Sequence, residues 1–140
     1  MKLGWLLYSL RYIWELAQNI LGLIIYLLNT KKITSVRKTN GRLLFENQNF
    51  GVSLGNYIFW TPSINDRNFN IPINLKHEFG HSIQSQIFGS LYLILIGLPS
   101  ISRVFYSKIF YSVKKQEWAN YYKGYPEKWA DTLGMKHYKI

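Results

Sequence analysis

The stretch His77-Glu78-Phe79-Gly80-His81 decides the fold of this chain, because it has the spacing H-E-x-x-H. Successive residues of an α-helix are about 100° apart, so residues four positions apart lie on one face. His77 and His81 can therefore both offer an imidazole nitrogen to one metal ion. Glu78 lies beside that ion, where its carboxylate can take a proton from a water molecule bound to the metal. The stretch predicts a helix with a divalent metal site, and Zn²⁺ is the expected cofactor.

The residues around the motif predict the limits of its helix. Pro72 stands where the first turn of a helix tolerates proline, and Gly89 stands where a helix that ends near Phe88 takes a left-handed cap. About four to five turns fit between them. Inside this helix Gly80 costs about 1 kcal/mol relative to alanine. A glycine there indicates close packing or the close approach of a substrate.

Two histidines leave a catalytic zinc one short of its usual three protein ligands. The best candidate for the third is Glu127, in a segment from 125 to 134 that reads as a short helix with Pro126 at its first position and Gly134 as its stop. Asp131 lies four residues later on the same face and can accept the second ring N–H of a ligand histidine. Glu117 and Glu46 are the competing third ligands. A solvated surface helix is the alternative interpretation of segment 125–134.

The motif H-E-x-G-H followed by E-x-x-A-D resembles the gluzincin metallopeptidases. Within them it is most similar to the membrane-bound group that contains the heat-shock protease HtpX and the CAAX prenyl proteases. The resemblance implies that His77, His81 and Glu127 bind zinc and that Glu78 is the general base. It also implies that Asp131 hydrogen-bonds a ligand histidine without itself binding the metal. It covers about a tenth of the chain, which is much shorter than those proteins and has no room for their long membrane spans.

The remaining segments predict an α+β, zincin-like fold, helix-rich with a small antiparallel sheet beside the motif helix and a hydrophobic helix at the N-terminus. Residues 42–46 and 51–60 read as strands, with turns at 40–41 and 47–51. By resemblance, residues 52–60 are a sheet edge to which an extended peptide adds as another strand. A plain hairpin under the helix is the alternative. Residues 61–70 read as a loop.

Composition limits the possible partners. The chain has 140 residues, of which 48% are hydrophobic and 17% aromatic, so it is long and apolar enough to fold. It has no cysteine, which excludes disulfides and thiolate ligands. Its net charge of +10 is typical of proteins that bind nucleic acid or an anionic membrane. Basic residues directly after the apolar runs favour the membrane, and no signature of a nucleic-acid module occurs.

The N-terminal segment is expected to associate with that membrane. Residues 1–30 are interpreted as a hydrophobic anchor or interfacial helix, ahead of a metallopeptidase domain at 31–140. Arg11, Glu15, Gln18 and Asn19 interrupt the apolar stretch, and a span needs about 20 largely apolar residues. A span, an interfacial helix with Arg11, Glu15 and Gln18 on one polar face, and a soluble core helix are the three alternatives. No small-x-small cleavage site is present, so we expect the segment to stay uncleaved.

A second apolar stretch, residues 90–101, contains Pro99. Proline breaks a helix interior, and the stretch is too short to cross a membrane cleanly. We expect it to be broken at Pro99 and to pack, buried or half-inserted, on the motif helix.

The expected function is a membrane-associated zinc metallopeptidase that hydrolyses peptides or proteins. The reaction needs a donor for the oxyanion that develops on the scissile carbonyl, and Tyr121, Tyr122 and His137 lie close enough to Glu127 in the sequence to supply it. The alternative is a membrane-active, toxin-like protein or a binding protein with a structural metal site. An enzyme loses activity in Glu78→Gln, whereas a structural site is indifferent to this change.

Overall fold

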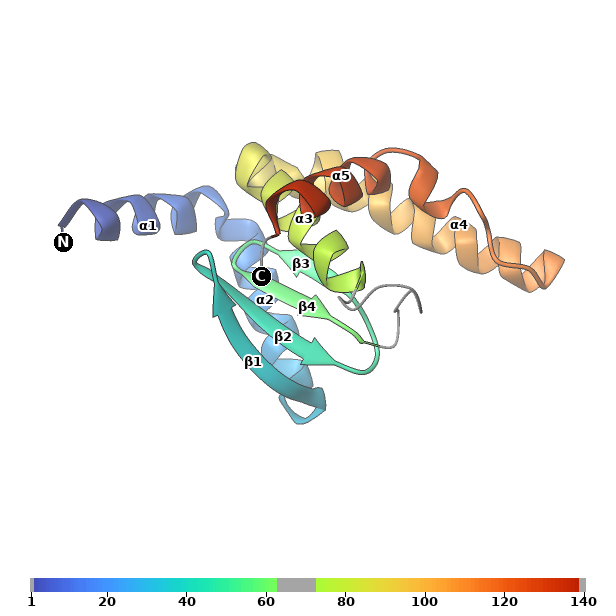
Figure 1. The fold of residues 1–140 in the computed structure, drawn as a ribbon, viewed down its shortest axis with the longest axis horizontal. Helices are drawn as coiled ribbons and strands as arrows, with labels where there is room; N and C mark the ends of the chain where they lie inside the picture. The colour runs from blue at the N-terminus through green and yellow to red at the C-terminus, as the bar shows by residue number, and fades with distance from the viewer. Residues whose placement is uncertain (1, 63–72, 139–140) are drawn as a thin grey trace.

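The N-terminal apolar segment forms two helices rather than one. The computed structural model describes residues 2–62 and 73–138, and it places α1 at Lys2–Trp14 and α2 at Leu16–Asn29 (Figure 1). The two helices meet at Glu15, whose backbone angles (φ −103°, ψ 27°) depart from helical values. Pro72 and most of the predicted loop at 61–70 lie outside the described residues.

Glu15 turns inward and forms a buried ion pair with Arg42. Its Oε1 lies 3.0 Å from Nη1 of Arg42 and accepts a hydrogen bond from Ser85 Oγ at 2.5 Å. Arg42 also donates to the carbonyls of Ser82, at 2.7 Å, and of Gly55. Burial lowers the pKa of Arg42 to about 10, against the opposing effect of Glu15, so the guanidinium stays charged at neutral pH. The ion pair therefore joins α2, the sheet and the motif helix.

Gln18 and Asn19 extend this buried network. Gln18 Nε2 donates to the carbonyl of Gly89, and Asn19 Oδ1 accepts the backbone N–H of Asn56 at 2.7 Å. Glu15, Gln18 and Asn19 are all buried. The interpretation of Arg11, Glu15 and Gln18 as the polar face of an interfacial helix is thus wrong for Glu15 and Gln18, because both are buried and hydrogen-bond inside the protein.

The sheet has four strands in the order β1-β2-β4-β3. These are β1 (Ile33–Thr39), β2 (Arg42–Asn47), β3 (Val52–Leu54) and β4 (Tyr57–Trp60). The pairs β1–β2 and β3–β4 are antiparallel, but β2 and β4 are parallel, so the predicted antiparallel sheet is a mixed one. The segment that reads as one strand from 51 to 60 reverses at Gly55, whose φ is +60°, and β4 then lies between β2 and β3. Glycine adopts this backbone conformation without steric cost.

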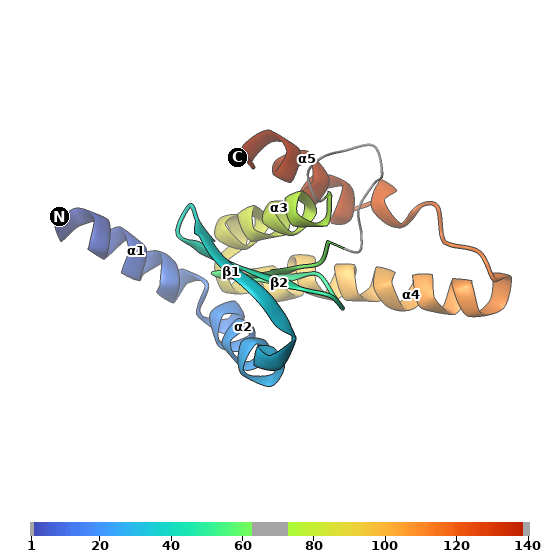
Figure 2. The ribbon, with the colours of Figure 1, turned by 60° about the horizontal axis from the view of Figure 1, so that its bottom comes forward.

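Helices cover both faces of the sheet. The motif helix α3 (Ile73–Phe88) lies on one face with α5 (Glu127–His137), and α2 lies on the other (Figure 2). Side chains alternate along the strands, so Leu44 and Ile58 pack under α3 with Phe79. On the opposite face Phe45 packs against Tyr26 of α2, with ring centroids 5.1 Å apart. This two-sided core fixes the position of α3.

The helices α3 and α5 cross in backbone contact. A Cβ atom at Gly80 would collide with the carbonyl oxygen of Ala130, and one at Gly134 would collide with that of Lys76. The close packing predicted from Gly80 is confirmed. The helix end predicted at Gly134 is wrong, because α5 continues to His137 and the glycine instead permits the crossing.

The second apolar stretch is one continuous helical segment. A π-turn (Leu93–Gly97) leads into α4 (Leu98–Lys114), and Pro99 lies in the first turn of α4, where its missing N–H does not break the helix as predicted. Together Leu93–Lys114 comprise 22 residues, within which an 18-residue window has a mean hydropathy of 1.4, and by length and composition alone this segment is able to cross a membrane. Core helices of soluble proteins pass the same test. Among the described residues, the helix that is long and apolar enough to cross a membrane is therefore internal, whereas the N-terminal segment was expected to be the membrane anchor.

Candidate metal centre

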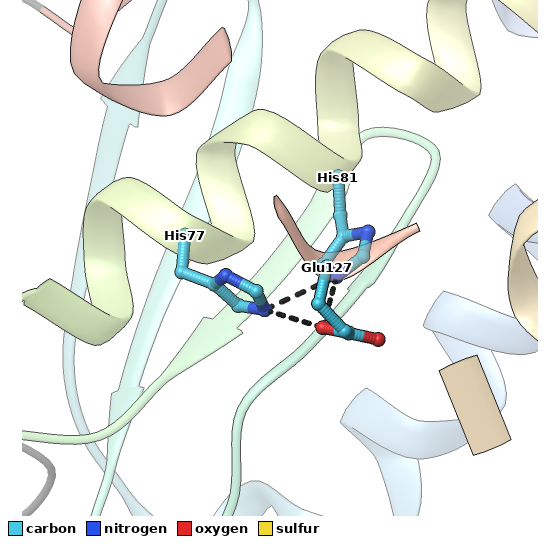
Figure 3. A group of neighbouring side chains, drawn as sticks. All are labelled: His77, His81 and Glu127. Carbon is cyan, nitrogen blue, oxygen red and sulfur yellow. Dashed lines mark hydrogen bonds and ion pairs between the residues drawn. The ribbon is translucent and has the colours of Figure 1, made fainter. Parts of the chain in front are cut away.

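Three buried side chains converge between α3 and α5. His77 and His81 project from one face of α3, and Glu127 comes from the first turn of α5 (Figure 3). Oε2 of Glu127 lies 3.0 Å from Nε2 of His77 and 3.3 Å from Nε2 of His81. The two Nε2 atoms are 3.2 Å apart. The structure thus brings together the three residues predicted to bind the metal.

The spacing of these donor atoms fits a tetrahedral ion. Zinc bonds of about 2.0–2.1 Å place neighbouring ligand atoms about 3.3 Å apart in a tetrahedron. The three distances between donors, 3.0, 3.2 and 3.3 Å, are close to that value. Two imidazoles and a carboxylate suit Zn²⁺, and they also suit other divalent transition metals.

Each histidine has a separate acceptor for its other ring nitrogen. Nδ1 of His77 donates to Oδ1 of Asp131, and Nδ1 of His81 donates to Oε1 of Gln84, each at 2.7 Å. With the proton on Nδ1, a neutral ring presents the lone pair of Nε2 to the cluster, as metal binding requires. The contact of Asp131 agrees with the prediction. Gln84 was missed, although it follows His81 by three residues and so lies on the same helix face.

The cluster concentrates negative charge. Burial alone would lower the pKa of His77, but hydrogen bonds to Asp131 and Glu127 and the charge of Glu78 outweigh it and raise that pKa to about 10. Burial raises the pKa of Glu127, yet its hydrogen bonds to His77 and His81 prevail and hold it well below its usual range. Three carboxylates around two imidazoles thus favour a positive charge at this point, which a proton or a metal cation supplies.

Glu78 lines the same cavity as the three donor residues. The cavity has a volume of about 490 Å³. Asn74 hydrogen-bonds the carboxylate of Glu78. The Oε2 atom of Glu78, however, has no hydrogen-bond partner among the described residues. Burial raises the pKa of Glu78, despite the opposing effect of His77 and His81. A buried carboxylate oxygen without a partner therefore lies beside the cluster, as a general base requires.

The three predicted oxyanion donors differ in their positions. Tyr121 lines the cavity. Tyr122 instead packs edge-on against His77, with ring centroids 5.2 Å apart, and His137 is exposed in the last turn of α5, so neither belongs to the cavity lining. Burial raises the pKa of Tyr121, and it raises that of Tyr122 to about 12, so both phenols keep their protons at neutral pH. Tyr121 is the better placed donor.

The two competing ligands lie apart from the cluster. Glu46 is on β2, where its Oε2 lies 3.9 Å from Nη2 of Arg37 on the neighbouring strand. Glu117 is exposed in the segment between α4 and the short 3₁₀ helix η4 (Tyr121–Lys123). Of the three predicted candidates, the structure therefore places only Glu127 with the motif histidines.

The edge strand β3 forms another wall of the cavity. Its residues Val52–Leu54 line the cavity, whereas β4, which was predicted to belong to the same edge, lies inside the sheet. The hydroxyl of Tyr92 donates a hydrogen bond to the carbonyl of Ser53 at 3.1 Å. An extended peptide could thus pair with a strand edge of only three residues here, and the carbonyl of Ser53 on that strand is already hydrogen-bonded to Tyr92.

Comparisons with protein-family models, with curated proteins and with solved structures find no match for this chain. The resemblance to gluzincins and the zincin-like fold therefore stay predictions. The chemistry of the site has to be argued from its own geometry.

Proposed function

We propose that this protein is a membrane-associated zinc metallopeptidase of the gluzincin type, with the apolar N-terminal helices contributing to membrane attachment. One observation carries the proposal. His77, His81 and Glu127 converge in a buried cluster, and Glu78, whose Oε2 has no hydrogen-bond partner in the described part of the chain, lines the same cavity. Two imidazoles, one carboxylate ligand and a separate carboxylate base are the groups that zinc-assisted hydrolysis needs.

The number of ligands favours an enzyme over a structural metal site. Structural zinc sites are closed by four protein ligands, whereas catalytic sites have three and keep one position open. The cluster offers three donor residues, and all three border a cavity of about 490 Å³. A ligand position that opens into such a space is available to water and substrate. This supports hydrolysis rather than the alternative of a toxin-like or binding protein with a structural metal.

The residues divide the chemical work between them. His77, His81 and Glu127 would hold the ion, which when bound supplies a Lewis acid and lowers the pKa of water to about 7. Glu78 accepts a proton from the attacking water and passes it to the nitrogen of the leaving amine. The hydroxyl of Tyr121 donates to the oxygen of the scissile carbonyl as negative charge develops there. One water molecule is consumed, and one carboxyl group and one amine are released.

Metal content tests the ligand set. We expect one metal ion per chain, by mass spectrometry, in detergent-purified wild type and in the control Glu117→Ala, which removes an exposed glutamate. His81→Ala and Glu127→Ala should lose the ion, because each removes one of three donors. Wild-type protein without metal would contradict the proposal.

Cleavage of a fluorogenic peptide library tests the role of Glu78. Glu78→Gln should reduce cleavage by about 10²–10⁴-fold, as expected for a lost general base, and should keep its metal. Glu46→Gln is the matched control, since Glu46 lies on β2 and contacts Arg37 instead of the cluster. Equal cleavage by wild type and Glu78→Gln would favour the structural-metal alternative.

A further inference from the structure

The distribution of polar and apolar side chains on α2 is inverted. Its buried residues are Gln18, Asn19 and Gly22. Its exposed residues are large and apolar: Leu16, Ile20, Leu21, Leu23, Ile24, Leu27 and Leu28. A helix in water normally buries its apolar side, because each large apolar side chain left exposed forgoes burial free energy. The exposed side of α2 is therefore suited to an apolar surrounding.

A second apolar stripe runs along α4. Leu98, Ile101, Phe105, Ile109 and Val113 recur every three to four residues, so they share one helix face, and they are between 53% and 71% exposed. On another face Arg103 donates to the carbonyls of Asn120 and Tyr121. The stripe is thus left uncovered by the contacts that fasten α4 to the rest of the protein.

The metal-site cavity lies between these two apolar surfaces. Leu21 of α2 and Leu98 and Ile101 of α4 line the cavity and are also exposed on the surface. The mouth of the cavity is therefore bordered by the same apolar side chains that form the two stripes. Whatever covers these helices also covers the entrance to the metal site.

The return segment after α4 indicates how the helix meets a membrane. Arg103 binds the carbonyls of Asn120 and Tyr121 and its Cζ lies 4.7 Å from the ring centroid of Trp118, so residues 115–121 double back along α4. If α4 crossed a bilayer, this irregular segment with the exposed Glu117 would cross with it. Irregular backbone exposed to lipid does not occur in the hydrocarbon region. An α4 that lies in the plane of the interface avoids this cost.

The charge of the protein selects the kind of surface. The net charge is +10, and exposed lysines follow each apolar helix: Lys31 and Lys32 after α2, and Lys114 and Lys115 at the end of α4. Lysines beside an apolar helix are attracted to anionic lipid headgroups. At about 1.5 Å per residue the 14 residues of α2 span only about 21 Å, too little to cross about 30 Å of hydrocarbon.

We propose that α2 and α4 lie in one leaflet of an anionic bilayer, parallel to its surface, and that the metal-site cavity opens toward the lipid. The functional meaning of the opening rests on the proposed peptidase function, whereas the binding to lipid does not. Substrates then reach the cluster from the membrane interface rather than from bulk water.

Vesicle flotation of the full chain tests the lipid-binding face. Binding should be stronger to vesicles that contain phosphatidylglycerol than to phosphatidylcholine alone, and Phe105→Glu should weaken it at least about tenfold. Met135→Glu is the matched control, because Met135 is similarly exposed but lies on α5. Equal losses in both variants, or self-association of the wild type without vesicle binding, would overturn the proposal.

Single cysteines test the orientation, since the chain has none of its own. Lys114→Cys on protein bound from outside should stay reactive to an impermeant thiol reagent, and a protected thiol would show that α4 crosses instead. A polarity-sensitive dye at Leu98→Cys, at the cavity mouth, should shift to the blue on vesicle binding, whereas one at Met135→Cys should not. Metal content measured on the same samples separates the two proposals, because vesicle binding with the blue shift but without metal in the wild type would support the lipid-binding face and contradict the peptidase.

Discussion

A neutral side chain connects the two halves of the metal centre. Gln84 is buried, accepts the Nδ1–H of His81 at 2.7 Å and donates from Nε2 to the carbonyl of Pro126 at 3.1 Å. Pro126 directly precedes Glu127, so one amide orients a ligand on α3 and holds the start of α5, which carries the third ligand. The two histidines thus differ, since His77 has the carboxylate of Asp131 in the corresponding place.

We predict that Gln84→Leu weakens metal binding by about 10–100-fold, the usual effect of removing the acceptor of a ligand histidine. Leucine has a similar size but leaves His81 Nδ1 without its acceptor, and it removes the side-chain bond to the carbonyl of Pro126, which then keeps only the backbone N–H of Ala130. Competition with a chromophoric chelator measures the affinity. Gln86→Leu is the control, because Gln86 lies two residues later and is exposed. Unchanged affinity in Gln84→Leu would mean that Gln84 does not orient the ligand.

The predictable part of the site follows from local geometry. His77, Glu78 and His81 occupy one turn of a helix, and the spacing of Glu127 and Asp131 places them on one face of another, so residue order was sufficient. The pairing of Glu15 with Arg42 was not predictable, because these residues are 27 positions apart and only the folded sheet brings them together. Without knowledge of such a distant partner, polar residues within an apolar helix are interpreted as the polar face of a helix at a membrane surface.

Among the elements, the crossing of α3 and α5 determines whether the cluster forms. The ligands come from both helices, and the backbones touch at Gly80 and Gly134. A side chain at either glycine would meet a backbone carbonyl, which cannot rotate away as a flexible side chain does. The distance between the helices, and hence between the donors, therefore depends on these two positions.

We expect Gly134→Ala to lower the free energy of unfolding by about 1–3 kcal/mol or more, because its Cβ would overlap the carbonyl oxygen of Lys76. Chemical denaturation measures this loss, and metal content should fall with it as α5 moves away. Gly97→Ala is the control, since a Cβ there meets no atom closer than 3.8 Å. Equal stability of the two variants would show that the crossing tolerates a side chain.

Element boundaries were predictable only where a local signal and the tertiary contact agree. The motif helix ends at Phe88, and the next residue, Gly89, has φ +54°, as the cap signal indicates. Gly134 carries the same signal but lies inside a helix, because helix packing rather than chain reversal requires it. At Gly55 the chain reverses direction between β3 and β4, but the apolar pattern from 51 to 60 reads as one strand and gives no sign of this turn.

Over the whole molecule, the metal centre is part of the stability of the fold. It joins α3, in the middle of the chain, to α5 near its end, and the carboxylates of Glu78 and Glu127 are buried where an unbalanced charge is costly. A cation that binds only the folded protein stabilises it by mass action. Loss of metal should therefore affect the entire domain rather than the cavity alone.

Removal of metal by a chelator should lower the Tm of the wild type, and added Zn²⁺ should restore it. At a free concentration 100 times its Kd the ion contributes about 2.7 kcal/mol. His81→Ala provides the comparison, because chelator should not change its Tm once a ligand is missing. Scanning calorimetry in detergent measures both proteins. An identical Tm for the wild type with and without chelator would mean that no ion contributes to its stability.

The buried pair of Glu15 and Arg42 also constrains how this sequence can change over generations. Loss of Glu15 would leave Arg42 inside the protein without its counterion, at a cost of about 3–5 kcal/mol. Loss of Arg42 would leave the buried Glu15 with only the partly exposed Arg11, 3.4 Å away, so a single substitution at either position is selected against. Replacement of both by apolar residues is far less harmful. Descendants of a common ancestor should therefore carry both residues or neither, and covariation between positions 15 and 42 should be detectable in their sequences.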